Sequence, residues 1–316
     1  MDDHCDSSDT GRRVEDAHRR SKQATLRSAG GAYRGDAMNE LRIAYTPDSD
    51  DVFTFCGWEH GHIESGLDAV SVSFERGHIR ELNEAARQEV YDVVAVSSVI
   101  YPSLSDRYWI LAVGTSVGRG WGPIVASKRF DRIEQLAGKR VGVGGHPTTG
   151  SVLTCMFGPT CELVSMPYDE IADAVVADQI DAGVMIHEEL LHFAELGLTK
   201  VLDLGSAWEG ATGSALPVGL NLVHHRVGME TARRIATACQ RSLCWANENY
   251  DQAIGVANRF GRGKAEKHVS MFSNEDTLCL PNDVRGALRI LFDRIAAMGH
   301  GPRINEFVVV DGEVKP

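Results

Sequence analysis

The sequence predicts an α/β protein built from two lobes, and three features of the 316-residue chain support this class. From Leu41 onward, short apolar runs typical of buried strands alternate with patterns typical of helices. Such alternation indicates an α/β fold with mostly parallel sheets. Two glycine-rich segments, 118–122 and 216–219, lie where the chain can cross between two sheets. We therefore expect two α/β lobes joined by two connecting strands.

The crossings set the expected domain boundaries. Lobe 1 is discontinuous and comprises residues 39–121 and 218–316, whereas lobe 2 comprises residues 122–217. A cleft between two such lobes is a natural ligand site. Residues 1–38 are rich in charged residues, Ser and Gly, lack a periodic apolar pattern and are predicted to be a disordered extension. Met38 is a candidate start of the folded protein.

The individual elements follow from apolar periodicity and from turn residues between them. The predicted strands span residues 41–46, 69–74, 91–96, 109–114, 122–127, 140–144, 161–165, 181–186, 200–203 and 218–224. The predicted helices span residues 51–60, 78–88, 149–157, 168–178, 188–196, 229–249, 251–260, 264–272 and 283–298. A short extended tail at 307–310 completes the expected fold.

Composition excludes several classes of function. The net charge of −12 argues against a nucleic-acid partner, which normally requires a basic surface. The sequence has no apolar run near the roughly 20 residues that span a bilayer, and no signal-peptide pattern. Seven cysteines without a C-x-x-C pair favour reduced thiols in the cytoplasm and argue against a zinc or iron–sulfur site.

The most informative residue is His187, where an apolar strand pattern stops and Glu188, Glu189 and a helical pattern follow. This places His187 at the carboxyl end of a strand, the edge at which ligands bind in open α/β sheets. The positive end of a helix dipole disfavours the imidazolium, so we expect a neutral base. A simple cap or turn residue is the alternative. His192 follows at a spacing that puts it about 140° around a helix, which argues against a shared metal.

Four further segments carry candidate ligand contacts. The glycine turn before Thr148 and Thr149 opens a helix whose free N–H groups suit a carboxylate or another small anion, with simple capping as the alternative. Thr46 and Asp51 bound a polar loop after the first strand, where helix capping is the competing role. Ser97 and Ser98 end a buried strand and either bind an oxygen of the ligand or cap the next helix. Trp208, in a polar loop, either stacks on an aromatic ligand or belongs to the core.

Taken in order, these segments resemble the menaquinone-biosynthesis family of the futalosine pathway. The resemblance covers about residues 41–300. It is carried by Thr46-Pro47 and Asp51 with Phe53 and Phe55, Ser97 with Tyr101, Gly118 with Gly122-Pro123, Thr148-Thr149, Ile186-His187-Glu188 with Gly197-Leu198, Asp203-Leu204-Gly205 with Trp208, Thr212-Gly213 and Leu216-Pro217, and Asn274 with Thr277.

The resemblance implies a type II periplasmic-binding-protein-like fold used as a cytoplasmic enzyme. The implied reaction is a lyase reaction that releases 1,4-dihydroxy-6-naphthoate from cyclic dehypoxanthine futalosine, with no metal or redox cofactor. His187 corresponds to the proposed base of this family. The resemblance also places Ser97, Thr148 and Thr149 beside a carboxylated aromatic substrate and Trp208 at its ring. Further expected substrate contacts are Thr46, Asp51, Ser98, Glu188 and Asn274. A homodimer is one expected assembly, and no membrane or nucleic-acid partner is expected.

Two segments depart from the family pattern. The first loop commonly reads Ser-Pro-Cys-Pro-Asn-Asp in the family, but here it reads Thr46-Pro-Asp-Ser-Asp-Asp51. The added carboxylates are expected to weaken binding of an anionic ligand or to change the ligand. The Thr-Leu-Asp of the family becomes Thr277-Leu-Cys279. A paralogue with another small substrate, a non-catalytic organic-anion binding protein and a cytoplasmic sensor of an aromatic acid therefore stay open as alternatives.

Overall fold

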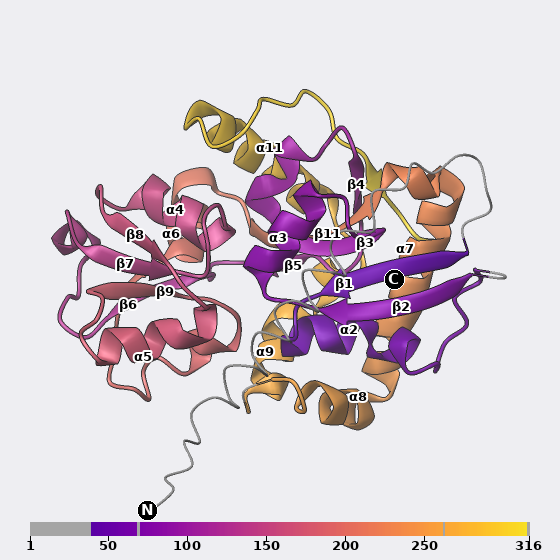
Figure 1. The fold of residues 1–316 in the computed structure, drawn as a ribbon, viewed down its shortest axis with the longest axis horizontal. Coiled ribbons are helices and arrows are strands. Elements are labelled where there is room, and N and C mark those ends of the chain that lie inside the picture. Colours follow the sequence, from indigo (N-terminus) through magenta and orange to yellow (C-terminus); the bar gives the residue numbers. More distant parts are fainter. Residues whose placement is uncertain (1–38, 68–69, 262, 315–316) are drawn as a thin grey trace, which may run out of the picture. The chain divides into compact units, whose positions relative to one another are not determined.

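The computed structural model describes residues 39–67, 70–261 and 263–314. The predicted extension at 1–38, including Met38, lies outside these ranges. The described residues form two separate β-sheets, each with helices packed against it (Figure 1). The chain leaves the first sheet between Gly118 and Ile124 and returns to it between Asp203 and Leu216.

The first sheet contains strands from both ends of the described chain. Its order is β12-β4-β11-β3-β1-β2, and β5 pairs with β11 beside β4. These strands are β1 (Glu40–Tyr45), β2 (Ser71–Arg76), β3 (Val93–Ser97), β4 (Tyr108–Leu111), β5 (Ser116–Gly118), β11 (Leu216–His224) and β12 (Val309–Val310). Strand β1 runs parallel to β2 and β3, whereas the returning strand β11 runs antiparallel to β3, β4 and β5.

The second sheet has the order β10-β6-β9-β7-β8. Its strands are β6 (Ile124–Ser127), β7 (Arg140–Val143), β8 (Glu162–Ser165), β9 (Ala182–Met185) and β10 (Thr199–Asp203). Helices α4 (Thr149–Phe157) and α6 (Leu204–Thr212) lie on one side of this sheet, and α5 (Ile171–Val176) lies on the other (Figure 1). The prediction of mostly parallel sheets is wrong for both sheets, because β6 and β11, which follow the two crossings, pair antiparallel with their neighbours.

The remaining helices belong to the half of the fold that contains the first sheet. They are α2 (Ser49–Glu59), α3 (Ile79–Arg87), α7 (Met229–Glu248), α8 (Tyr250–Ala257), α9 (Ala265–Phe272), α10 (Glu275–Leu278) and α11 (Asn282–Ala297). Short 3-10 segments are η1 (Ser98–Ser103), η2 (Ile133–Leu136), η3 (Tyr168–Glu170), η4 (His187–Leu191) and η5 (His225–Val227). None of the helices in the described ranges is long and apolar enough to cross a membrane.

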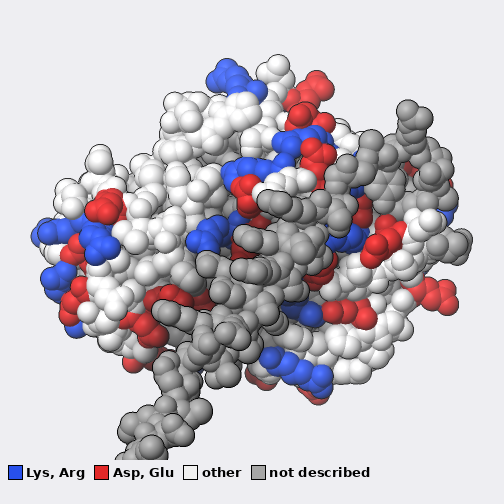
Figure 2. Space-filling view, in the orientation of Figure 1, with Lys and Arg blue, Asp and Glu red and all other residues white. Residues whose placement is uncertain are grey.

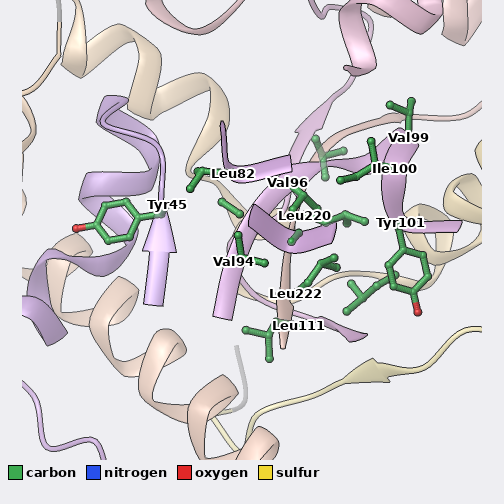
Figure 3. Close-up of a cluster of buried hydrophobic side chains, with 14 of the residues drawn as sticks. Tyr45, Leu82, Val94, Val96, Val99, Ile100, Tyr101, Leu111, Leu220 and Leu222 are labelled. Atoms are coloured by element: carbon green, nitrogen blue, oxygen red, sulfur yellow. The ribbon is translucent and has the colours of Figure 1, made fainter. Parts of the chain in front are cut away.

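The central strands of the first sheet have continuous apolar sequences, as expected for strands that are buried on both faces. Val94 and Val96 of β3 pair with Leu222 and Leu220 of β11, and all four side chains are buried. Figure 3 shows these side chains together in the core with Leu111. At the surface, acidic and basic side chains are interspersed over the face shown in Figure 2. This core fixes the strand ends from which the site is built.

Two segments differ from the predicted elements. The predicted helix at 188–196 is the short 3-10 segment η4 followed by turns, bounded by His187 and Gly197, whose φ values are 55° and 75°. The expected polar loop after Asp203 is instead the helix α6. The Asp203 carboxylate accepts hydrogen bonds from the N–H groups of Gly205 and Ser206, and Gly213 ends the helix with φ of 67°.

Candidate active site

A cavity lies between the two sheets and holds about 720 Å³ of empty space, part of it open to solvent. Its polar lining residues come from the β1–α2 loop, the first turn of α2, the end of β3, the start of β5, the start of α4, η4, β11 and α9. They are Thr46, Asp50, Asp51, Ser97, Ser116, Thr148, Thr149, His187, Asn221 and His268. Apolar side chains such as Ile79, Leu190 and Phe272 form much of the rest. A mainly apolar cavity with a few polar groups suits a small organic ligand.

His187 and Asp48 form a close pair beside this cavity. His187 Nδ1 lies 2.6 Å from Asp48 Oδ2, within the range of an ion pair. The Tyr168 hydroxyl donates a hydrogen bond to Asp48 Oδ1 at 3.1 Å, and the Tyr168 ring lies 4.7 Å from the imidazole. His187 Nε2 is buried and has no hydrogen-bond partner among the described residues. One ring nitrogen is therefore oriented by a carboxylate, while the other is left for a ligand.

The charge state of His187 differs from the sequence-based expectation. Burial of the imidazole acts to lower its pKa, but the nearby charges of Asp48, Asp50 and Asp51 outweigh burial and raise the pKa above its ordinary value. The predicted neutral histidine is therefore wrong in direction, because three carboxylates, and not a helix dipole, dominate its surroundings. Burial acts to raise the pKa of Asp48, but the charge of His187 outweighs this effect and lowers it.

The acidic loop, defined here as Asp48 and the first turn of α2 through Asp51, shows how so many carboxylates are held together. Asp51 Oδ2 accepts hydrogen bonds from Thr46 N at 3.0 Å and from Thr46 Oγ1 at 2.6 Å, which closes the loop on itself. Burial, followed by the charge of Asp50, raises the pKa of Asp51 to about 7. Asp50 Oδ2 accepts from Ser116 Oγ at 3.1 Å. The acidic loop thus carries a proton of its own near neutral pH, and its Asp48 carboxylate pairs with a histidine.

The start of α4 supplies donors for an anion. Thr148 Oγ1 donates to Gly145 O and accepts from Ser151 N, so Thr148 is a helix cap. Thr149 Oγ1 donates to Val218 O at 2.6 Å, so its proton is already used. The N–H groups of Thr149 and Gly150 lie in the first helical turn, where no intrahelical acceptor exists. These backbone groups, and not the two hydroxyls, are the available donors for a carboxylate.

Ser97 also lines the cavity, held by a double contact with Asn83. Ser97 N donates to Asn83 Oδ1 at 2.9 Å, and Asn83 Nδ2 donates to Ser97 Oγ at 3.1 Å. The hydroxyl of Ser97 therefore keeps its own proton for an acceptor in the cavity. Neighbouring Ser98 is fully buried at the start of η1 and does not line the cavity, so the prediction that it contacts the ligand is not supported by its position.

Three other predicted contacts lie away from the cavity lining. Trp208 is fully buried in α6 and donates its indole N–H to Ala215 O at 2.9 Å, as a core residue does. Glu188 Oε2 lies 3.4 Å from the N–H of Lys264, next to α9. Asn274 caps α10 by accepting from Asp276 N. None of the three lines the cavity, so their positions do not support the predicted contacts with substrate.

The structure adds residues that the sequence did not single out. His268 and Asn221 both line the cavity, and both are almost fully buried. Asn221 Nδ2 donates to Gly114 O at 3.1 Å, while its Oδ1 has no partner among the described residues. Neither residue lies in a recognisable motif, since His268 occurs within a charged helical turn and Asn221 within an apolar strand. Only their convergence on one cavity identifies them.

Similar structures define the class of this protein. The described fold matches the periplasmic aliphatic sulphonate binding protein of Escherichia coli with a TM-score of 0.61 at 10% identity, over 89% of this chain and 96% of that chain. At that identity the likeness concerns the fold alone. The chain has a two-lobed, type II periplasmic-binding-protein-like fold with two mixed sheets. A structure from Archaeoglobus fulgidus matches with a TM-score of 0.79 at 35% identity, over 84% of this chain and all of that one.

Sequence comparison then gives the family. The family described as "Menaquinone biosynthesis" matches residues 41–297, so the chain belongs to the menaquinone biosynthesis family. A 1,4-dihydroxy-6-naphthoate synthase of Streptomyces coelicolor is 31% identical over 278 residues, 85% of this chain and 97% of that protein. The protein of the same name from Thermus thermophilus is 29% identical over 83% of this chain and 96% of its own length.

Proposed function

We propose that this protein is a cofactor-independent lyase that forms 1,4-dihydroxy-6-naphthoate from cyclic dehypoxanthine futalosine. The match to the relatives named as 1,4-dihydroxy-6-naphthoate synthases extends over nearly their whole length, which supports this activity. The observation that carries the mechanism is the 2.6 Å pair of Asp48 and His187, a lining residue of the cavity whose Nε2 has no partner among the described residues. A carboxylate-oriented imidazole is a standard general base.

In the proposed step, the aromatic carboxylate of the substrate binds at the N-terminus of α4. His187 Nε2 removes a proton from the carbon next to a carbonyl group, and the sugar-derived fragment then leaves. Asp48 stabilises the imidazolium that forms, because its carboxylate lies against Nδ1. The apolar lining limits water around the reacting atoms, which strengthens this electrostatic interaction. A general base of this kind contributes roughly 10²–10⁴-fold to the rate.

The raised pKa of His187 makes the proposed mechanism depend on pH. Only the neutral imidazole accepts a proton, so the active fraction grows as the pH rises through the raised pKa. We also propose that the enzyme acts in the cytoplasm, in keeping with the described cysteines, all of which are free.

The test is to incubate the purified protein with cyclic dehypoxanthine futalosine and to measure dihydroxynaphthoate by chromatography. The wild type should form product, and His187→Ala should form none while still binding the product. Full activity of His187→Ala would rule out the assigned base. The second candidate is a non-catalytic organic-anion binding protein, and the cleft between two lobes is the feature that supports it. Tight binding of an aromatic carboxylate without any turnover would favour this candidate.

A further inference from the structure

His268 on α9 lines the cavity, and one of its ring nitrogens is engaged by protein while the other is unpaired among the described residues. The residue is 1% exposed. Its Nδ1 lies 3.0 Å from Ser49 Oγ and 3.6 Å from Asp50 Oδ1. Its Nε2 is buried without a hydrogen-bond partner among the described residues, although His268 lines the cavity. Buried polar atoms normally have partners, so this nitrogen is open to a ligand atom.

The contacts of Ser49 indicate which nitrogen carries the proton. A hydroxyl needs an acceptor for its hydrogen, and His268 Nδ1 is the acceptor that the described structure offers to Ser49 Oγ. Asp50 Oδ1, at 3.6 Å, is too far from Nδ1 for a hydrogen bond. With Nδ1 accepting from Ser49, the neutral ring carries its hydrogen on Nε2. His268, a residue of the cavity lining, therefore has a donor without a partner among the described residues.

The fold brings this donor close to the assigned base. Helix α9 packs against both η4, which begins at His187, and β5, whose Ser116 binds Asp50. Ser49 and Asp50, which lie against His268 Nδ1, directly follow Asp48, whose carboxylate pairs with His187. The ring of His268 is held in place by Phe272, with centroids 4.5 Å apart. Two fixed imidazoles thus share one cavity, and each leaves its Nε2 unpaired.

We propose that His268 Nε2–H donates a hydrogen bond to the substrate carbonyl oxygen that becomes an enolate when His187 removes the neighbouring proton. This inference rests on the proposed function. In that step the C–H bond breaks, its proton goes to His187 Nε2, and its electron pair moves toward the carbonyl oxygen, which gains the negative charge. His268 keeps its own proton and stabilises that charge. A donor fixed before the reaction is an effective way to stabilise an oxyanion.

Two substitutions at His268 separate this role from a structural one. In His268→Gln the side-chain amide reaches the place of Nε2, so a donor remains at the cavity while the contact with Ser49 is lost. In His268→Asn the amide reaches only the place of Nδ1, so the contact with Ser49 remains while the cavity donor is lost. A role in the reaction predicts that Asn is the damaging change, whereas a purely structural role predicts that Gln is.

The readouts are kcat for cyclic dehypoxanthine futalosine, calorimetric affinity for 1,4-dihydroxy-6-naphthoate, and the melting temperature without ligand. His268→Asn should lower kcat by about 100-fold, the low end for loss of an oxyanion donor. It should weaken product binding by up to about 10-fold. His268→Gln should stay within about 10-fold of the wild-type kcat, because it keeps a donor. Equal effects of both variants, or a wild-type kcat in His268→Asn, would overturn the inference.

Ser49→Ala provides a second test, which is decisive if the Asn variant does not fold. Without the hydroxyl, Nδ1 can carry the proton toward Asp50, which leaves Nε2 without a hydrogen. We expect kcat to fall about 10-fold or more, less than for loss of the donor itself. An unchanged kcat in this variant would refute the assigned tautomer. Absence of turnover by the wild type would refute the proposed function itself. Normal turnover by both the wild type and His268→Asn would refute only the role of His268.

Discussion

Replacing Asp48 by Asn tests the electrostatic core of the proposed mechanism. Asn has nearly the same shape and can still accept from Tyr168, but it has no charge to stabilise the imidazolium of His187. The two atoms of the present pair are 2.6 Å apart and both side chains are largely buried. At this distance and an effective dielectric constant of about 20, the interaction of two unit charges is about 6 kcal/mol.

Only part of that energy acts in the transition state. With about half a unit charge on the imidazole at that point, loss of the carboxylate costs about 3 kcal/mol, or about 100-fold in kcat. The pH dependence changes as well. In the wild type the acid limb of kcat/KM should lie above pH 6.5, the ordinary pKa of histidine, because Asp48 raises the pKa of His187. In Asp48→Asn this limb should move to lower pH.

The assay is product formation from pH 5.5 to 9, with Asp178→Asn as the matched control. Asp178 is a half-exposed carboxylate 2.8 Å from Lys128 Nζ, does not line the cavity, and loses the same charge on substitution. The control should keep the wild-type kcat and acid limb. An Asp48→Asn enzyme within threefold of the wild-type kcat, with an unmoved acid limb, would refute the reasoning.

Four further outcomes follow from the same contacts. Asp51→Asn should raise the melting temperature more at pH 8 than at pH 5. The pKa of Asp51 is about 7 in the folded protein, so the wild type loses stability as pH rises from about 4 through 7. An equal gain at both pH values in thermal denaturation would contradict this. Trp208→Phe should lower the melting temperature by several degrees, since Ala215 O loses its donor, but should leave KM unchanged; a raised KM at constant stability would restore the stacking role. Thr149→Val should change calorimetric affinity for dihydroxynaphthoate by less than about threefold, because the hydroxyl proton is used by Val218 O; a larger loss would assign that hydroxyl to the ligand. The stability that the Asp48–His187 pair provides should be greatest between pH 3.8 and 6.5. It should be lost as pH rises through the raised pKa of His187 or falls through the lowered pKa of Asp48. The measurement is the melting temperature of the wild type and of Asp48→Asn as a function of pH.

Apolar periodicity predicted most of the fold because buried strands and long amphipathic helices carry strong local patterns. The strand ending before His187 and the helix starting at Thr149 are examples, and both are present as β9 and α4. Strand direction was not predictable in the same way, because antiparallel pairing of β11 depends on partners far away in sequence. Helix α6 was missed although Asp203 and Gly213 are ordinary cap residues, since the small residues between them were interpreted as a loop.

The site was predictable only where a residue ends a recognisable element. His187 and Thr149 follow strands or open helices, so their position at the ligand edge followed from the pattern. The pairing of Asp48 with His187 joins residues 139 positions apart and has no local signal. The same holds for His268, which lies on a helix that appears ordinary in sequence. The acidic loop, expected to weaken binding of an anionic ligand or to change the ligand, also places carboxylates beside His187 and His268.

The Asp48–His187 contact also makes proton binding and lobe closure one thermodynamic process. Asp48 follows a strand of the first sheet and His187 follows a strand of the second, so the pair joins the two lobes. Separating the lobes would remove the carboxylate from the imidazole and return its proton affinity toward the ordinary value. Closure therefore takes up protons in the range where His187 titrates, so mild acid favours the closed form until Asp48 itself becomes protonated.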